Sequence, residues 1–285
     1  MSRAVGLAPA WESGWVSNRR RKKRSRSRDG TSTPSAAGGL FGRGKSRPAV
    51  PTTDPVLFPE IGIRLPGITL GPKRLTAPAL AVRELPRIDL VLLSHAHSDH
   101  LDLRTLSRLN RSATVITALR TADLLRGQRF REVSELFWNE TKQLAAQAGA
   151  VQVSAIRVRY WGARKRRGTY RGYNAYLLER ANRRILFGGD TALTSFSDLR
   201  AHGPIDLAIL PIGAYGPWIH AHCTPEQAVR MADEAGARFV MPIHHQTFRL
   251  SFEEFHEPIE RLERALERAP ERIALRRIGE TFVVP

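Results

Sequence analysis

The sequence has little cysteine, no long apolar run, and fewer acidic than basic residues. Cys223 is the only cysteine among the 285 residues, so the chain can form neither an internal disulfide nor a cysteine-based zinc site. No apolar run approaches the ~20 residues that a membrane-spanning helix needs, and the first residues lack the apolar core of a signal peptide. We therefore expect a cytoplasmic protein, with peripheral attachment to a membrane as a variant of that expectation.

The excess of basic residues is unevenly distributed. Lysine and arginine number 45 against 27 aspartates and glutamates, and the net charge of +18 by itself suggests a polyanionic partner. Residues 1–48 carry +10 of this charge and have almost no periodic apolar residues. We expect them to form a disordered basic tail, solvated or foreign to the native protein, although Arg19–Arg28 would also suit a polyanion-binding arm. Residues 49–285, the expected folded domain, then carry only +8, so nucleic acid is not the expected partner.

From about Thr52 onward, strand and helix signals alternate and predict an α/β fold. Apolar strands are expected at 88–93, 175–178, 184–188, 205–212 and 238–243, a bulged strand at 151–160, and extended structure at 273–284. Asp102 is a suitable N-cap for a helix. Thr224-Pro225-Glu226-Gln227 combines an N-cap, a proline at the first helical position and a capping-box glutamine, and predicts a helix that Gly236 ends. A further helix is expected at 257–268.

The segment after the strand at 88–93 holds four side chains of metal-ligand type within six residues: His95, His97, Asp99 and His100. A loop that follows a strand can turn all four toward one point, which a regular helix or strand cannot do. Imidazole together with carboxylate suits zinc or a similar divalent ion. Because one ion rarely takes four ligands this close in sequence, the spacing suggests two adjacent ions.

Three more side chains stand where α/β proteins collect site residues. Asp190 follows two glycines at the end of a strand, where a carboxylate can bridge two cations. His244 comes directly after an apolar strand. His222 lies in a glycine- and proline-rich loop ahead of the helix that starts at Thr224, and for this residue a functional role and an ordinary surface role both stay open.

Several short motifs carry a resemblance to a known family. They are Ser94-His95-Ala96-His97-Ser98-Asp99-His100 after an apolar strand, Phe187-Gly188-Gly189-Asp190-Thr191, and a strand that ends in Ile243-His244. Together they resemble the metallo-β-lactamase superfamily. More narrowly, Gly71-Pro72-Lys73-Arg74, Pro211-Ile212-Gly213-Ala214-Tyr215 and the segment 222–229 are similar to the N-acyl phosphatidylethanolamine phospholipase D branch, which is close to the ascorbate-6-phosphate lactonase group. The similarity covers about Thr53 to Val284.

The resemblance implies an αβ/βα sandwich with Zn²⁺ at one edge of its sheets. By position, the ligands would be His95 and His97 for the first ion, Asp99, His100 and His244 for the second, and Asp190 as a bridge between them. A hydroxide held by the metals would attack a phosphorus or acyl carbon. Asp99 and His222 are the expected catalytic residues, with His222 orienting a phosphate or assisting the leaving group.

The chain departs from the branch pattern in two places. The branch has His-Trp where this chain has Tyr160-Trp161, and that histidine is a ligand of the first metal. A phenol, with an ordinary pKa of ~10, is a poor zinc ligand unless it ionises. We therefore expect one or two zinc ions, with the first site weakened. Members of the family also begin with strands that end in Thr-Asp-Pro. This chain has Thr53-Asp54-Pro55, but its sequence before Thr53 does not predict such strands. Either a reading-frame error in the upstream coding sequence or a diverged N-terminal arm would explain their absence.

A basic stretch at 157–171 adjoins the first metal site. Arg164, Arg167 and Tyr160 are the expected substrate-binding residues, and a solvated loop is the alternative.

We expect a metal-dependent hydrolase of phosphodiesters, in the manner of a phospholipase D, or of other phosphate-containing esters. The substrate would be an anionic small molecule or lipid, and an anionic membrane surface is a further expected partner. A lactonase or other acyl hydrolase, and a polyanion-binding protein with a decayed site, are the alternatives. The sequence does not set the oligomeric state.

Overall fold

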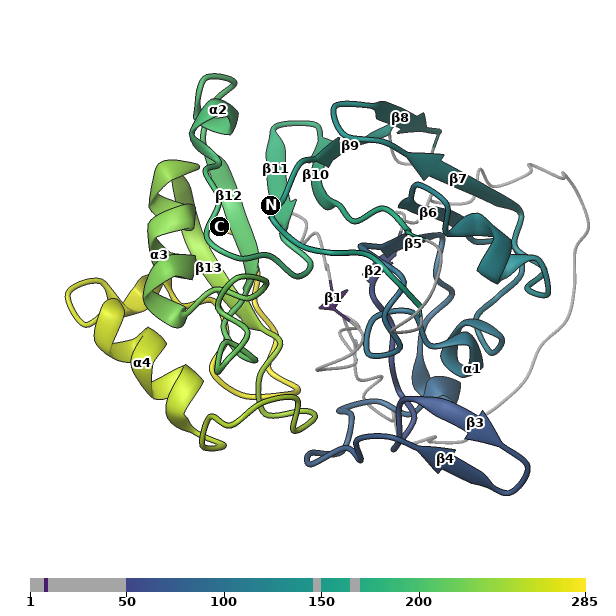
Figure 1. Ribbon diagram of the computed structural model, residues 1–285. Coiled ribbons are helices and arrows are strands. Elements are labelled where there is room, and N and C mark those ends of the chain that lie inside the picture. Colours follow the sequence, from purple (N-terminus) through teal and green to yellow (C-terminus); the bar gives the residue numbers. More distant parts are fainter. Residues whose placement is uncertain (1–7, 10–49, 146–149, 165–169) are drawn as a thin grey trace, which may run out of the picture.

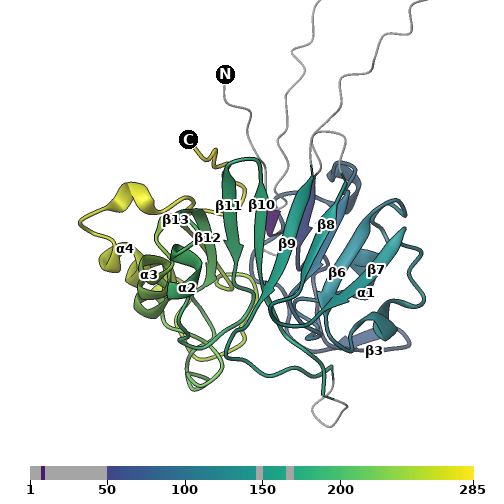
Figure 2. The same ribbon diagram turned by 90° about the horizontal axis from the view of Figure 1, so that it is seen from above.

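Two β-sheets lie side by side in the computed structural model, which describes residues 8–9, 50–145, 150–164 and 170–285 (Figure 1, Figure 2). The first sheet is parallel throughout, in the order β1 (Ala8–Pro9), β2 (Pro51–Thr53), β5 (Leu90–Leu93), β6 (Thr114–Ala118) and β7 (Glu132–Leu136). The second sheet is mixed, in the order β13 (Ala237–Ile243), β12 (Ile205–Pro211), β11 (Arg183–Phe187), β10 (Ala175–Arg180), β9 (Val151–Ile156) and β8 (Thr141–Leu144). Its strands β11 to β13 are parallel, and β8 to β11 are antiparallel.

The apolar side chains form three layers around these sheets. Residues of both sheets, among them Leu92, Tyr176 and Ile209, form one buried core. A second cluster joins the six-stranded sheet to α2 (Ser197–Arg200), α3 (Pro225–Glu234) and α4 (Glu257–Ala265). A third joins β5 and β6 to α1 (Leu103–Leu106) and the 3₁₀ helix η2 (Ala122–Leu125). Helices therefore cover the outside of both sheets, as Figure 2 shows, and the expected αβ/βα sandwich is confirmed.

The local signals that predicted the best-defined helix act as expected. The Thr224 side chain accepts a hydrogen bond from the Gln227 amide (3.3 Å), and the Gln227 side chain accepts one from the Thr224 amide (3.1 Å), so α3 begins with a capping box. Gly236 follows the helix with a φ of 70°, a conformation that favours glycine. Asp102 caps α1, but that helix is a single turn.

Two expectations about strands are wrong. The strand expected at 151–160 ends at Ile156, which pairs with Ala175, the first residue of β10, and among the described residues no partner strand continues beyond it. The extended structure expected at 273–284 makes only one bridge, between Ile273 and Val240. The amides of Arg276 and Arg277 both donate to the Glu280 side chain, so a turn interrupts the extended structure, and beyond it Phe282 packs on Phe239 of β13.

A small hairpin stands apart from the sandwich at the lower edge of Figure 1. It consists of β3 (Ile63–Leu65) and β4 (Ile68–Leu70), and Pro66-Gly67 forms its turn, with a φ of 78° at the glycine. Four of its apolar side chains are about half exposed or more: Ile63, Leu65, Ile68 and Leu70. The sequence interpretation did not include this hairpin.

The predicted basic tail, residues 1–48, lies outside the described residues except for Ala8–Pro9, which pair in parallel with Thr52 and Thr53. The nature of this tail and the absence of the usual first strands therefore stay predictions. Two 3₁₀ turns complete the described elements, η1 (Val82–Glu84) and η3 (Pro270–Arg272). Within the described ranges, no helix combines the length and apolar character needed to cross a bilayer.

Candidate metal centre

The loop that follows β5 is held in place at both ends. Leu90–Leu93 is buried throughout, so the start of the loop is fixed in the core. At its far end the Asp102 carboxylate accepts hydrogen bonds from the amides of Arg104 and Thr105. Between them, Nη1 of Arg164 donates to the carbonyls of Ala96 (2.9 Å) and Leu101 (2.7 Å). The loop is therefore anchored before any metal binds.

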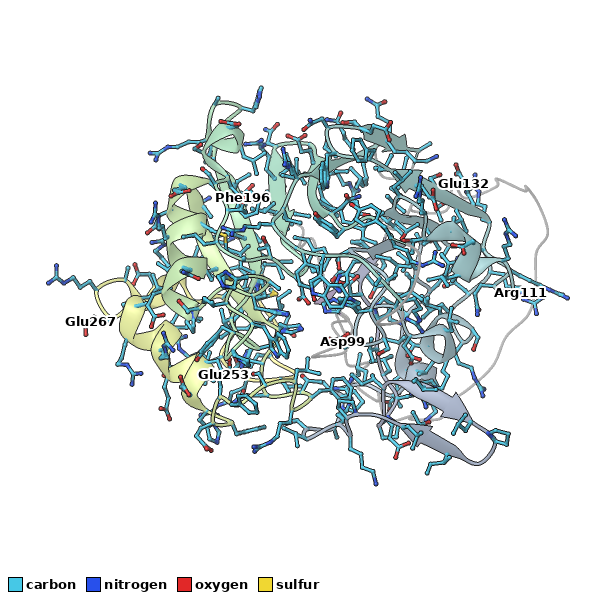
Figure 3. The ribbon with its side chains drawn as sticks, viewed as in Figure 1. Asp99, Arg111, Glu132, Phe196, Glu253 and Glu267 are labelled. Atoms are coloured by element: carbon cyan, nitrogen blue, oxygen red, sulfur yellow. The ribbon has the colours of Figure 1, made fainter. Side chains whose placement is uncertain are left out.

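Four of the predicted ligands converge to the spacing of a metal site. Asp99, His100, Asp190 and His244 each offer a ligand atom within 4.8 Å of the others. His100 Nε2 lies 3.2 Å from Asp190 Oδ2 and 3.7 Å from Asp99 Oδ2, and His244 Nε2 lies 3.4 Å and 3.6 Å from oxygens of the same two carboxylates. A tetrahedral ion with bonds of about 2.1 Å keeps its ligands about 3.4 Å apart. These residues, which we call the carboxylate half-site, therefore fit a divalent ion. Figure 3 labels one of them, Asp99.

Two other predicted ligands and Tyr160 form a second group, the imidazole half-site. His95 Nε2 lies 3.0 Å from His97 Nδ1, which lies 3.1 Å from the Tyr160 hydroxyl. Asp190 reaches this group as well, with Oδ2 3.8 Å from His95 Nε2. The structure therefore brings all six predicted metal ligands together and places the phenol oxygen of Tyr160 at a corner of the imidazole half-site.

Asp54 supports both half-sites from behind. Its carboxylate accepts hydrogen bonds from the Ser94 amide (2.7 Å), the Ser94 hydroxyl (2.5 Å) and His100 Nδ1 (2.7 Å). Because the Ser94 hydroxyl donates its proton to Asp54, its oxygen accepts from His95 Nδ1 at 2.8 Å. Both histidines thus carry their proton on Nδ1 and direct Nε2 toward the centre, an arrangement by which carboxylates commonly orient metal-binding imidazoles.

The sequence interpretation gave Asp54 no role, although it quoted Thr53-Asp54-Pro55. The available signal was a carboxylate directly after a strand. Asp54 follows β2, and Ser94 follows β5, the parallel neighbour of β2, so both residues leave the same edge of the sheet.

Burial and charge set the protonation of the centre. Burial lowers the pKa of His95 and His97, and both are neutral near pH 7. Burial opposes charge on His100 and His244 too, but nearby carboxylates, chiefly Asp190, outweigh it and raise the pKa of both. For Asp190 the desolvation is likewise outweighed, mainly by His100, and its pKa lies well below the usual range. Without a metal, protonated imidazoles balance the carboxylates, so a cation that binds there releases protons.

His222, for which both roles were open, lies inside the centre. Its ring stacks on that of His244, with centroids 5.1 Å apart, and its Nδ1 is 3.9 Å from Asp190 Oδ2. Burial lowers the pKa of His222 to about 4. His222 is therefore a neutral imidazole at pH 7 that lies beside the metal ligands.

The predicted substrate-binding residues have different surroundings. Tyr160 contacts the ligands directly, and burial followed by the charges of Asp190 and Asp99 raises its pKa well above 10. Arg164 donates to the ligand loop, and Arg167 lies outside the described residues, so substrate contact by either arginine stays a prediction. Elsewhere in the basic stretch, Arg157 stacks on Trp138, 5.0 Å from the ring centroid.

An open groove adjoins the imidazole half-site. It has a volume of about 660 Å³, and its lining includes Tyr160, Tyr173, Arg157, Arg159 and Ser195. The groove thus starts at the aromatic ring whose hydroxyl reaches the metal ligands.

Known proteins resemble this chain in sequence and in fold. The model of the beta-lactamase superfamily domain matches residues 53–245. The chain is 35% identical over 233 residues to a Mycobacterium tuberculosis protein of unassigned function, covering 78% of this chain and 60% of that one. It is 33% identical over 222 residues to the mitochondrial N-acyl-phosphatidylethanolamine-hydrolyzing phospholipase D of Saccharomyces cerevisiae, covering 74% of this chain and 47% of the yeast protein. The chain therefore spans between about half and three fifths of the length of these relatives.

A shorter relative and a solved structure share more of their length. A UPF0173 metal-dependent hydrolase of Bacillus cereus is 30% identical over 189 residues, with 62% of this chain and 76% of that protein covered. The crystal structure of a possible metal-dependent hydrolase from Veillonella parvula superposes with a TM-score of 0.58 at 16% identity, covering 81% of this chain and 91% of the other. At that identity the superposition supports the fold alone.

Proposed function

The chain belongs to the beta-lactamase superfamily, and we propose that it is a metal-dependent hydrolase that cleaves phosphodiesters in the manner of a phospholipase D. The observation that carries the proposal is the carboxylate half-site, whose four ligand atoms converge beside a neutral His222. The name of the yeast relative supports the reaction class. We propose Zn²⁺ as the metal, because two imidazoles and two carboxylates are donors that zinc accepts.

A divalent ion in this centre would supply a nucleophile from water at neutral pH and would balance the charge that develops on the phosphoryl group. Asp99, at the entrance of the carboxylate half-site, is the least buried of its ligands and accepts from His244, so it is placed to orient an incoming water. His222 is neutral and can donate one hydrogen bond to a phosphoryl oxygen or to the leaving group. The convergence of these groups argues against a decayed site.

The proposed substrate is an anionic amphiphile. The groove beside Tyr160 is lined by two exposed arginines, Arg157 and Arg159, which suit the anionic or polar part of such a molecule. Exposed apolar side chains lie on the loops around the centre. Trp161, half exposed, packs on His97 with ring centroids 4.3 Å apart, and Trp218 and Phe252 are exposed as well. These side chains would suit the acyl region of a lipid.

The proposal extends to the partner surface and the location. The β3–β4 hairpin continues toward the centre, because the Leu75 amide donates to the Thr247 carbonyl (2.7 Å), three residues after His244. We propose that the hairpin and the exposed aromatic side chains contact an anionic membrane from the cytoplasmic side. Cosedimentation with vesicles of phosphatidylglycerol, compared with vesicles of phosphatidylcholine, tests this contact, and equal weak binding to both would contradict it.

Chelator-sensitive turnover tests the reaction class. The purified protein, loaded with Zn²⁺, should hydrolyse bis-p-nitrophenyl phosphate and an N-acylated phosphatidylethanolamine, and dialysis against a chelator should abolish both activities. Turnover of a lactone in the absence of phosphodiester turnover would instead support an acyl hydrolase. An Asp99→Asn variant serves as the matched inactive control, since it removes one ligand charge at nearly constant volume.

A further inference from the structure

We propose that this centre holds one tightly bound divalent ion, in the carboxylate half-site, and that the phenol of Tyr160 takes the place of a ligand to a second ion in the imidazole half-site. This proposal rests on the metal centre, and none of its measurements requires the proposed phosphodiester reaction.

The two half-sites differ in the donors that they offer. The carboxylate half-site has two imidazoles and two carboxylates, with the contacts quoted above between 3.2 and 3.7 Å. The imidazole half-site has His95, His97 and a share of Asp190, and the remaining corner is the Tyr160 hydroxyl. A phenol is an O–H donor as well as an acceptor, whereas an imidazole at the same corner would offer a free lone pair. The second ion would therefore find two imidazoles and one shared carboxylate.

The Tyr160 hydroxyl also forms a hydrogen bond with a nitrogen atom that the second ion would need as a ligand. His97 Nδ1 lies 3.1 Å from the Tyr160 hydroxyl and 3.0 Å from His95 Nε2. Because His95 carries its proton on Nδ1, its Nε2 accepts, so His97 Nδ1 carries a proton and already has protein partners within the centre. An ion that binds Nδ1 must first break this hydrogen bond in a buried site, where an unmade bond costs the most.

The ring of Tyr160 cannot easily move aside. Its ring contacts those of His95 (centroids 4.8 Å apart), His222 (5.4 Å) and Tyr173 (6.2 Å), and it packs against the cluster under the six-stranded sheet. Rotation of the side chain toward solvent would abandon all of these contacts. The phenol is therefore a fixed part of the centre.

The placement has a consequence for Asp190. In a centre with one ion, Asp190 would be a ligand of that ion alone, and its remaining neighbours would be His95 at 3.8 Å, His222 at 3.9 Å and the hydrogen-bonded Tyr160 hydroxyl. The imidazole half-site then offers two neutral imidazoles and a phenol as hydrogen-bonding groups toward the substrate. We expect the second ion to bind at least about 100-fold more weakly than the first, since loss of even an indirect contact to a ligand costs 10- to 100-fold in affinity.

The test is the number of ions that the chain binds. Metal-free protein is titrated with Zn²⁺ by calorimetry and with Co²⁺ by its visible absorption, for the native chain and for Tyr160→His, Tyr160→Phe and Tyr173→Phe. We expect one tight ion in the native chain, two in Tyr160→His, and one in Tyr160→Phe. Tyr173→Phe makes the same chemical change in a tyrosine whose ring contacts that of Tyr160 and whose hydroxyl is hydrogen-bonded to Tyr170, and it should also bind one.

Two tight ions in the native chain, with affinities within about tenfold of each other, would overturn the inference. Thermal unfolding checks that each variant is folded. If Tyr160→His does not fold, the native count still decides, because a second tight ion in the native chain contradicts the role of the phenol. A protein that binds one ion but does not cleave phosphodiesters would refute the proposed function and leave this inference intact.

Discussion

Replacement of Asp54 by asparagine tests how far the metal centre depends on the carboxylate that lies behind both half-sites. Asp54 is fully buried, and three donors point at its two oxygens. An asparagine can place its carbonyl oxygen toward the Ser94 hydroxyl and His100 Nδ1, but its NH₂ then faces the Ser94 amide, which was 2.7 Å from the carboxylate. One charge-assisted hydrogen bond is lost and a buried N–H is left without an acceptor, a cost of about 2–4 kcal/mol.

Two measurements follow from this estimate. The thermal midpoint of the metal-free protein should fall by about 4–16 °C, since 1 kcal/mol corresponds to roughly 2–4 °C in a domain of this size. The affinity for Zn²⁺, measured by competition with a chromophoric chelator, should fall about 10- to 100-fold, because His100 loses the charged partner that orients it and raises its basicity.

Asp206→Asn is the matched control. Asp206 is also buried and accepts from the Arg184 amide (2.8 Å) and from Arg183 (2.9 Å), but it lies at the start of β12, within the strand and away from the ligands. This variant should lose stability and keep its metal affinity. A folded Asp54→Asn protein whose zinc affinity stays within threefold of the native value would refute the reasoning.

Three further predictions concern the same centre. Gly213→Ala should weaken metal binding and lower the thermal midpoint, because a Cβ there would lie 2.1 Å from the His244 carbonyl oxygen. The control variant Gly127→Ala, whose added Cβ has no atom within 4 Å, should change neither quantity. Equal thermal midpoints in the two variants would contradict this prediction. Arg164→Met should lower the thermal midpoint by about 2–12 °C, since two backbone carbonyls of the ligand loop lose their donor at a cost of about 1–3 kcal/mol. The affinity for zinc should rise with pH across the neutral range, by up to about 100-fold per pH unit. The reason is that the pKa values of His100 and His244 are raised, so two protons must leave when the ion binds. An affinity that does not change between pH 6 and 8 would exclude this proton release.

Local signals predicted most of the framework. The buried strand β5 and the capping box of α3 depend on residues close in sequence, and both are observed as expected. The strand expected up to Tyr160 fails because the end of a strand depends on its partner, and β10 starts opposite Ile156. The pairing of strands far apart in sequence is not encoded in a local pattern of residues, so the end of a strand cannot be predicted from its own sequence.

The residue order alone places His95, His97, Asp99 and His100 in one loop after a strand, and the chemistry of these donors suits a divalent metal. Resemblance to a family added the more distant ligands and the departure at Tyr160. Which atoms meet depends on which strands are neighbours, and that became known from the three-dimensional structure. The pairing of β2 with β5 brings Asp54 behind His100, and the packing of the Tyr160 ring directs its hydroxyl onto His97 Nδ1. These contacts of a few ångströms join residues 46 and 63 positions apart, so they arise from the fold as a whole, and no short stretch of sequence encodes them.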